Sequence, residues 1–314
     1  MVVDKKCAPG KKYLDGSCIS KKHLIEMAKK WNEKNKNEPI IITQDKNELV
    51  KQFEDKLSDK CSNQVCWLRL DFVKKLENSD LLDNTFRPSG PKGKYEWLST
   101  TDIDNVINQY QSNYKEFLFL GAVPYDFDSL KFLGIHDLDF KELEQSGKYK
   151  IGMVINLDEH YKSGSHWVGL YTNLKDNQIY YFDSVGKKPR KRIKKFINRI
   201  TKYLYNKNYN DKLNINSLYN KLEQHWAKPN VLERKVSLSS EQYAGKNDIV
   251  NNLSKFDIRY NHIQHQFKDS ECGVYSIHFI TRLVEGETFD SIINNVIKDD
   301  IMNQFRKQYF ININ

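Results

Sequence analysis

A cysteine stands between an acid and a glycine at the start of an apolar run, in the stretch 264-QHQFKDSECGVYSIHFI-280. A helix that begins at this residue, Cys272, would direct its positive dipole end and its free N–H groups toward the sulfur and so favour the thiolate. Gly273 would let a substrate approach closely. The alternative is that Cys272 packs in a core helix, because cysteine is among the most buried residue types.

A cysteine nucleophile needs a base and a group that orients the base. His166 begins an expected strand, 166–173, where the ring would be held rigidly but remain accessible. Asp183 lies at the end of the next expected strand, 178–184, which would pair with the first as a hairpin. Its carboxylate could accept from a ring N–H and fix the tautomer of the imidazole.

The reaction also needs donors for the oxyanion. Gln266 lies six residues before Cys272, near the end of an expected strand at 262–267, and its side-chain amide could donate beside the Cys272 backbone N–H. His265 and His278 also lie near the cysteine in sequence. Their strand and helix positions favour packing roles for both.

The elements that must position these residues alternate between helical and strand patterns, and this order favours an α+β fold. A segment rich in proline and glycine, 84–97, is the best boundary between an N-terminal helical module, 1–90, and a catalytic domain, 91–314. Helices are expected at 19–34, 46–59, 100–114, 191–205 and 271–284, and strands at 149–157, 166–173, 178–184 and 262–267.

The composition places the chain among globular proteins. Of its 314 residues 39% are hydrophobic, enough for a sizeable core and too many for a disordered chain. The net charge of +9 favours contact with a polyanion, although a lysine-rich surface would give the same value. The basic run 187-KKPRKRIKK-195 could make non-specific contact with nucleic acid, act as a nuclear import signal, or form the solvated face of a helix.

The cysteines are five in number and irregularly spaced, which predicts no disulfide framework and favours a reducing, intracellular compartment. No apolar run is long enough to span a bilayer, so no membrane contact is expected. Two alternatives remain open for the other four cysteines. A papain-type nucleophile at 16-GSCI-19 is one, and the other is a zinc site built from Cys7, Cys18, Cys61 and Cys66.

The order His166, Asp183, Gln266, Cys272 resembles that of the clan of ubiquitin-like-protein (SUMO) proteases and adenovirus endopeptidase. The matching motifs are 166-HW-167, 183-DS-184 and 266-QFKDSECG-273, within a resemblance that covers roughly 93–290. It implies a papain-like core with a central mixed sheet flanked by helices. It also implies a thiol endopeptidase that needs no metal or organic cofactor.

Two further segments, 117-FLFLGAVPYDFD-128 and 7-CAPGKKYLDGSCISKKHLIEMAKKWN-32, look like parts of SUMO-protease-like enzymes of large DNA viruses, such as African swine fever virus and giant amoebal viruses. This resemblance implies an N-terminal arm module and cleavage after Gly-Gly in core or structural polyproteins during virion maturation. It places the enzyme in the virion and the host cytoplasm.

SUMO proteases flatten a Gly-Gly tail between two tryptophans, and the resemblance assigns these roles to Trp97 and Trp167. A narrow aromatic slot admits only residues without side chains. Thr100 stands where the family's first motif, WLxD, has its acid. Two other functions stay open: a deubiquitinase or deSUMOylase acting on host conjugates, and a basic virion protein that kept an inactive protease fold.

Overall fold

The structure is a computed structural model. The chain forms two compact units, Met1–Lys92 together with Arg306–Asn314, and Gly93–Phe305. The predicted division into a helical module, 1–90, and a catalytic domain, 91–314, stays a prediction. No helix in the described part of the chain has the length and apolar character needed to cross a membrane. The described residues are 6–76, 81–208, 220, 222–223 and 256–311.

The first unit is helical, as predicted for the N-terminal module. The Ser20 hydroxyl accepts a hydrogen bond from the His23 N–H and caps the first helix, which buries the expected apolar stripe of Leu24, Met27 and Trp31. This stripe packs with the second helix in one core. The helices of the described part of this unit are α1 (Lys21–Lys34), α2 (Lys46–Leu57), α3 (Gln64–Leu68) and α4 (Asp71–Lys74).

Four of the cysteines form disulfides in this unit, so the prediction of no disulfide framework is wrong. Cys7 is bonded to Cys18, and Cys61 is bonded to Cys66. The odd total reflects two short cross-linked loops plus one free thiol, Cys272. A papain-type nucleophile at Cys18 and a zinc site of four thiolates are both excluded in this structure, because these sulfur atoms are already bonded.

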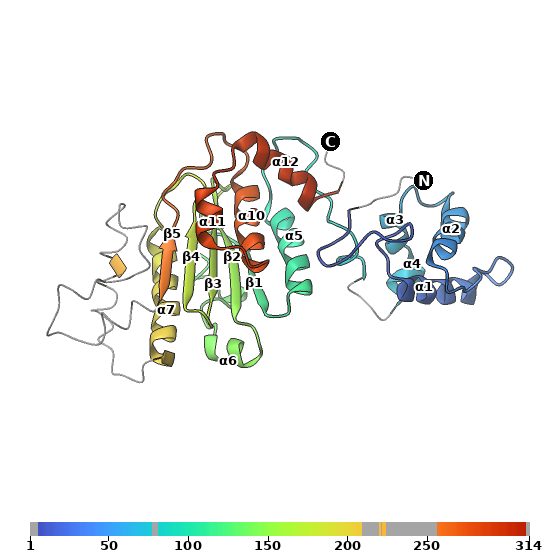
Figure 1. Ribbon diagram of the computed structural model, residues 1–314, viewed down its shortest axis with the longest axis horizontal. Helices are drawn as coiled ribbons and strands as arrows, with labels where there is room; N and C mark the ends of the chain where they lie inside the picture. The colour runs from blue at the N-terminus through green and yellow to red at the C-terminus, as the bar shows by residue number, and fades with distance from the viewer. Residues whose placement is uncertain (1–5, 77–80, 209–219, 221, 224–255, 312–314) are drawn as a thin grey trace. The chain divides into compact units, whose positions relative to one another are not determined.

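The second unit contains a mixed five-stranded sheet with the order β1-β2-β3-β4-β5 (Figure 1). The central strands β2, β3 and β4 are antiparallel, including the predicted hairpin, whereas the two outer strands pair in parallel. The first strand was not predicted from the sequence. The strands are β1 (Phe117–Val123), β2 (Lys150–Asn156), β3 (Trp167–Asn173), β4 (Gln178–Phe182) and β5 (Asp257–Tyr260).

Helices cover both faces of this sheet. On one face α10 packs against β2 and β3, and α5 packs against β1. Gly169 of β3 makes this approach possible, because a Cβ there would lie 2.7 Å from the Phe279 ring of α10. On the other face α7 shares a core with the alternate side chains of the strands. These helices are α5 (Thr100–Asn113), α7 (Lys191–Asn208) and α10 (Cys272–Val284).

Shorter helices complete the described part of the second unit, and they were not predicted either. They are η2 (Lys131–Leu133), α6 (Phe140–Gln145), α11 (Phe289–Asn294) and α12 (Asp299–Tyr309). The residues of α12 from Arg306 onward are counted with the first unit.

The strand predicted at 262–267 is wrong in position. The ladder with β4 ends at Tyr260, because the side chain of Asn261 replaces the next backbone pair. Its amide oxygen accepts from the Asp183 N–H at 2.7 Å, and its amide nitrogen donates to the Asp183 carbonyl at 2.8 Å. The chain then runs in an irregular path to α10.

The disulfide pairing can be tested by alkylating the denatured protein with iodoacetamide and measuring its intact mass. Without reductant we expect one adduct, on Cys272, and with reductant five. Two loops of this size stabilise a fold by about 2–3 kcal/mol each in the chain-entropy model, so reductant should also lower the melting temperature. Five adducts without reductant would show that the cysteines are free.

Candidate active site

Cys272 is the first residue of α10 and is only 3% exposed. The orientation of α10 therefore matches the prediction, with the positive end of the helix dipole next to the sulfur. The low exposure alone would also suit a core cysteine. What separates the two readings is the set of polar groups around the thiol.

His166 and Asp183 lie together at the ends of β3 and β4, as predicted. His166 Nε2 is 2.7 Å from Asp183 Oδ1, and the carboxylate is 1% exposed. The antiparallel register pairs Gly169 with Phe182. The residue before β3, His166, and the residue after β4, Asp183, therefore come to the same end of the strand pair. The Val185 N–H also donates to Asp183 Oδ1 at 3.0 Å, which fixes the carboxylate.

The pKa of His166 connects this pair to the thiol. Burial of the ring lowers the pKa, but hydrogen bonds to Asp183 and to Cys272 and the charges of both outweigh burial and raise it to about 9. Because Nε2 is held by Asp183, Nδ1 is the ring atom available to the sulfur. At neutral pH the imidazole is therefore protonated beside the cysteine, an arrangement that stabilises a thiolate.

Gln266 lies in the irregular segment before α10, not in a strand as expected, and it is 4% exposed. The Ser184 hydroxyl donates to Gln266 Oε1 at 2.5 Å, and Gln266 Nε2 donates to the Lys268 carbonyl at 2.6 Å. The Ser184 carbonyl also accepts from the Gln266 N–H at 2.8 Å. These contacts fix the side-chain amide of Gln266, and its role as a donor to the oxyanion stays a prediction.

Sequence reasoning missed Asn261 and Ser184 as supporting residues. Asn261 is fully buried and holds the backbone of Asp183, while Ser184 holds Gln266. The signal for Ser184 was present in the 183-DS-184 motif, because a small hydroxyl directly follows the orienting acid. Asn261 carried no comparable signal, because the strand before it, 257-DIRY-260, has two charged residues and was not predicted.

The segment before α5 closes one side of the site. The Trp167 Nε1–H donates to the Leu98 carbonyl at 2.9 Å. A Cβ at Gly273 would lie 2.9 Å from Leu98 Cβ, so the missing side chain makes room for Leu98. Trp97 is 47% exposed, whereas Trp167 is buried. The substrate-binding roles expected for Trp97, Trp167 and Gly273 stay predictions.

His265 and His278 are packing residues, as predicted. Both rings are buried, and burial lowers the pKa of each, to about 4 for His278. Neither ring is therefore charged at neutral pH. His265 Nε2 lies 3.2 Å from the Ile293 carbonyl, which satisfies the ring within the core. In the described residues, no group of three or more His, Cys, Asp or Glu side chains is arranged to hold a metal ion.

Comparison with known proteins agrees with this geometry. The family model described as "Ulp1 protease family, C-terminal catalytic domain" matches residues 148–314. This segment contains the His166–Asp183 dyad, Gln266 and Cys272. The chain belongs to the Ulp1 protease family. A protein of Acanthamoeba polyphaga mimivirus that is named a thiol protease is 31% identical to it, over 95% of this chain and 90% of its own length.

A cysteine protease of African swine fever virus is 21% identical over 84% of this chain and 88% of its own. The crystal structure of such a protease has a TM-score of 0.56 and 18% identity, over 97% of this chain and 95% of that one. This Ulp1-family chain is thus a viral cysteine protease, with the predicted α+β fold of a mixed sheet flanked by helices.

The pH dependence of this Ulp1-family protease should follow His166. If the protonated imidazole and the thiolate are the resting form, kcat/KM falls as pH rises through about 9. The Asp183→Asn substitution removes one of the two charges that raise the pKa of His166, so the alkaline limb should move toward 6.5, the ordinary value. Rates on a peptide substrate between pH 5 and pH 10 would measure this shift, and an unchanged limb would exclude Asp183 as its cause.

The same raised pKa predicts how stability depends on pH. A group whose pKa rises on folding stabilises the fold fully below its unfolded pKa of 6.5 and loses that effect as pH rises through about 9. The difference in unfolding free energy between wild type and His166→Gln should therefore shrink between these two values. Urea titrations at pH 6 and pH 9.5 would test this, and an equal difference at both would contradict it.

Ser184→Ala should lower kcat by about 10-fold with little change in KM, because the Gln266 amide loses the partner that orients it toward a transition-state charge. In a Gln266→Ala background the same substitution should have no further effect on kcat. Additive losses in the double variant would show that Ser184 acts independently of Gln266. Melting temperatures of all three variants provide the control.

Proposed function

We propose that this protease is an endopeptidase that cleaves after Gly-Gly-type sites in viral core or structural polyproteins. The observation that supports it most is the shared location of His166, Asp183 and Cys272, from two strand ends and one helix start. Such an arrangement supplies a thiolate, a proton carrier and an orienting acid together. The intact set argues against an inactive protease fold.

In the proposed reaction, the Cys272 thiolate attacks the carbonyl carbon of the scissile peptide bond. The carbonyl oxygen then becomes the oxyanion of a tetrahedral intermediate. The Gln266 amide and backbone N–H groups at the start of α10 donate to that oxygen. The His166 imidazolium then gives its proton to the leaving amine, and the acyl-enzyme forms as the C–N bond breaks. A water molecule, deprotonated by His166, releases the acid product and the thiolate.

The preference for glycine is inferred from the segment that closes the site. Leu98 lies against Gly273 and accepts a hydrogen bond from Trp167, so the wall beside Cys272 is apolar and close. The exposed ring of Trp97, the residue before Leu98, is available to an incoming chain. A peptide that passes between these groups would have to lack side chains near the scissile bond.

A second candidate function is removal of ubiquitin or a ubiquitin-like protein from host conjugates. African swine fever virus relatives, 20% identical to this chain, carry the name SUMO-1 cysteine protease. Thr100 replaces the acid of the WLxD motif, and the residue is the first of α5. The nearby Asp102 accepts a hydrogen bond from the Ser99 N–H in a capping box. Its carboxylate is therefore already used and does not take the place of the missing acid of the motif. Polyprotein cleavage is therefore the preferred proposal.

We place this activity in the virion and the host cytoplasm. The proposed activity requires a free thiol, and Cys272 is free. The two disulfides of the first unit would have to persist in the cytoplasm, where structural disulfides are rare. Nucleic-acid contact through the run 187–195 is not part of this proposal, because hydrolysis at Cys272 does not need it.

Cys272→Ala should abolish cleavage, by at least about 10³-fold, while the melting temperature stays within a few degrees of wild type. The assay would use peptides with Gly-Gly, Gly-Ala or Ala-Ala before the scissile bond, beside diubiquitin, a SUMO conjugate and a viral core polyprotein. We expect cleavage of the Gly-Gly peptide and of the polyprotein. Equal cleavage by Cys272→Ala would refute the nucleophile, and preference for a conjugate would favour the second function.

A further inference from the structure

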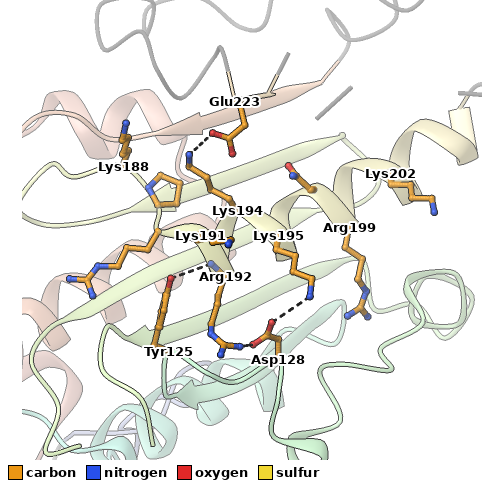
Figure 2. A pocket seen from close by; sticks show the side chains of 13 residues that line it. Tyr125, Asp128, Lys188, Lys191, Arg192, Lys194, Lys195, Arg199, Lys202 and Glu223 are labelled. Carbon is orange, nitrogen blue, oxygen red and sulfur yellow. Dashed lines mark hydrogen bonds and ion pairs between the residues drawn. The ribbon is translucent and has the colours of Figure 1, made fainter. Parts of the chain in front are cut away.

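A pocket at α7 is lined mainly by basic side chains (Figure 2). Its lining includes eight lysines and arginines but only two carboxylates, Asp128 and Glu223, so a strong positive charge remains. Figure 2 shows the side chains spread along one side of α7 and over the turn before it. The basic residues are Lys188, Arg190, Lys191, Arg192, Lys194, Lys195, Arg199 and Lys202.

The arginines of this pocket are already engaged. Arg190 donates to the Leu157 carbonyl at 3.0 Å, and Arg192 donates to Asp128 at 2.5 Å. Arg199 donates to the carbonyls of Ile135 and Leu138 at 2.8 and 2.5 Å. One guanidinium nitrogen of Arg190, one of Arg192 and two of Arg199 therefore already donate to the protein itself.

The lysines are left for a partner. Lys194 is paired with Glu223 at 2.7 Å, and Lys195 reaches Asp128 at 4.0 Å, a carboxylate that it shares with Arg192. Within the described ranges, no carboxylate lies at ion-pair distance from Lys188, Lys191 or Lys202, and all three are exposed. Ammonium groups on flexible stems make point contacts with phosphates and read no bases.

The spacing of these lysines suits an extended anion. Lys191 and Lys202 are eleven residues apart on one helix, which corresponds to about 16 Å of rise. A nucleic-acid strand advances about 3.4 Å per phosphate, so this length matches about five nucleotides. A single phosphate ion would not engage both ends.

The pocket and Cys272 belong to helices on opposite faces of the sheet. The apolar side of α7 packs on Ile151, Leu170 and Ile179, whereas α10 packs over Gly169. An occupant of the α7 pocket therefore does not compete with a peptide at Cys272. This separation favours a partner other than the cleaved segment.

We propose that the α7 pocket binds the phosphate backbone of nucleic acid without sequence specificity and so anchors the protease on it. The proposal does not depend on the Gly-Gly specificity. An acidic protein segment is the competing partner, and polyglutamate stands for it in the test.

The test measures binding of a fluorescently labelled single strand of about 20 nucleotides and of its duplex by anisotropy, across a series of salt concentrations. We compare wild type with Lys188→Ala/Lys191→Ala/Lys202→Ala and with a control, Lys21→Ala/Lys29→Ala/Lys51→Ala. The control residues are exposed lysines of the helical unit, and both variants lose three charges. Polyglutamate of similar length serves as the competing anion.

The pocket variant should bind at least about 10-fold more weakly, and the slope of log K against log salt should fall by about 2–3. The control should stay within about twofold of wild type. Equal losses in both variants would overturn the proposal in favour of net charge alone. Tighter, pocket-dependent binding of polyglutamate would overturn it in favour of an acidic protein partner.

Cleavage of the Gly-Gly peptide by the pocket variant should be unchanged, since none of its three lysines touches the dyad. Nucleic-acid binding by Cys272→Ala should equal that of wild type. Failure of peptide cleavage in wild type would therefore count against the proposed function alone. Failure of pocket-dependent binding would count against this inference alone.

Discussion

The hydrogen bond between His166 and Asp183 is the interaction on which the site depends. It joins the residue just before β3 to the residue just after β4, so it exists only if these strands pair in one register. A slip of one residue would turn every side chain to the other face of the sheet. The carboxylate is only 1% exposed, so a lost partner would leave it buried and unpaired. The side chain of Asn261, the residue after β5, secures the backbone of Asp183.

The thiol reaches this dyad because α10 lies very close to the sheet. Gly169 and Gly152 both leave space that side chains of α10 or β1 fill, with Phe279 and Ile280 pressed against them. Close packing of this kind allows little adjustment, since interiors are nearly as dense as organic crystals. The position of Cys272 is thus set by apolar packing well away from any catalytic group.

The two faces of the sheet serve different physical purposes. One face is covered by α10, a helix buried on nearly all sides, whose first residue is Cys272. The other is covered by α7, which is apolar toward the sheet and strongly basic toward solvent. A sheet with both faces covered can therefore present a hydrolytic site on one side and a charged surface on the other.

The sequence by itself determined the order of the candidate site residues, the five longer helices that were predicted and the three central strands, because periodicity and end signals are local. His166, Asp183 and Cys272 could be chosen from the HW, DS and CG motifs, and the structure brings these residues together. Only the tertiary structure decided the pairing of the cysteines, the end of β5 at Tyr260 and the support that Asn261 gives. Each of these depends on groups that meet in space from distant parts of the chain, and no local pattern records such a meeting.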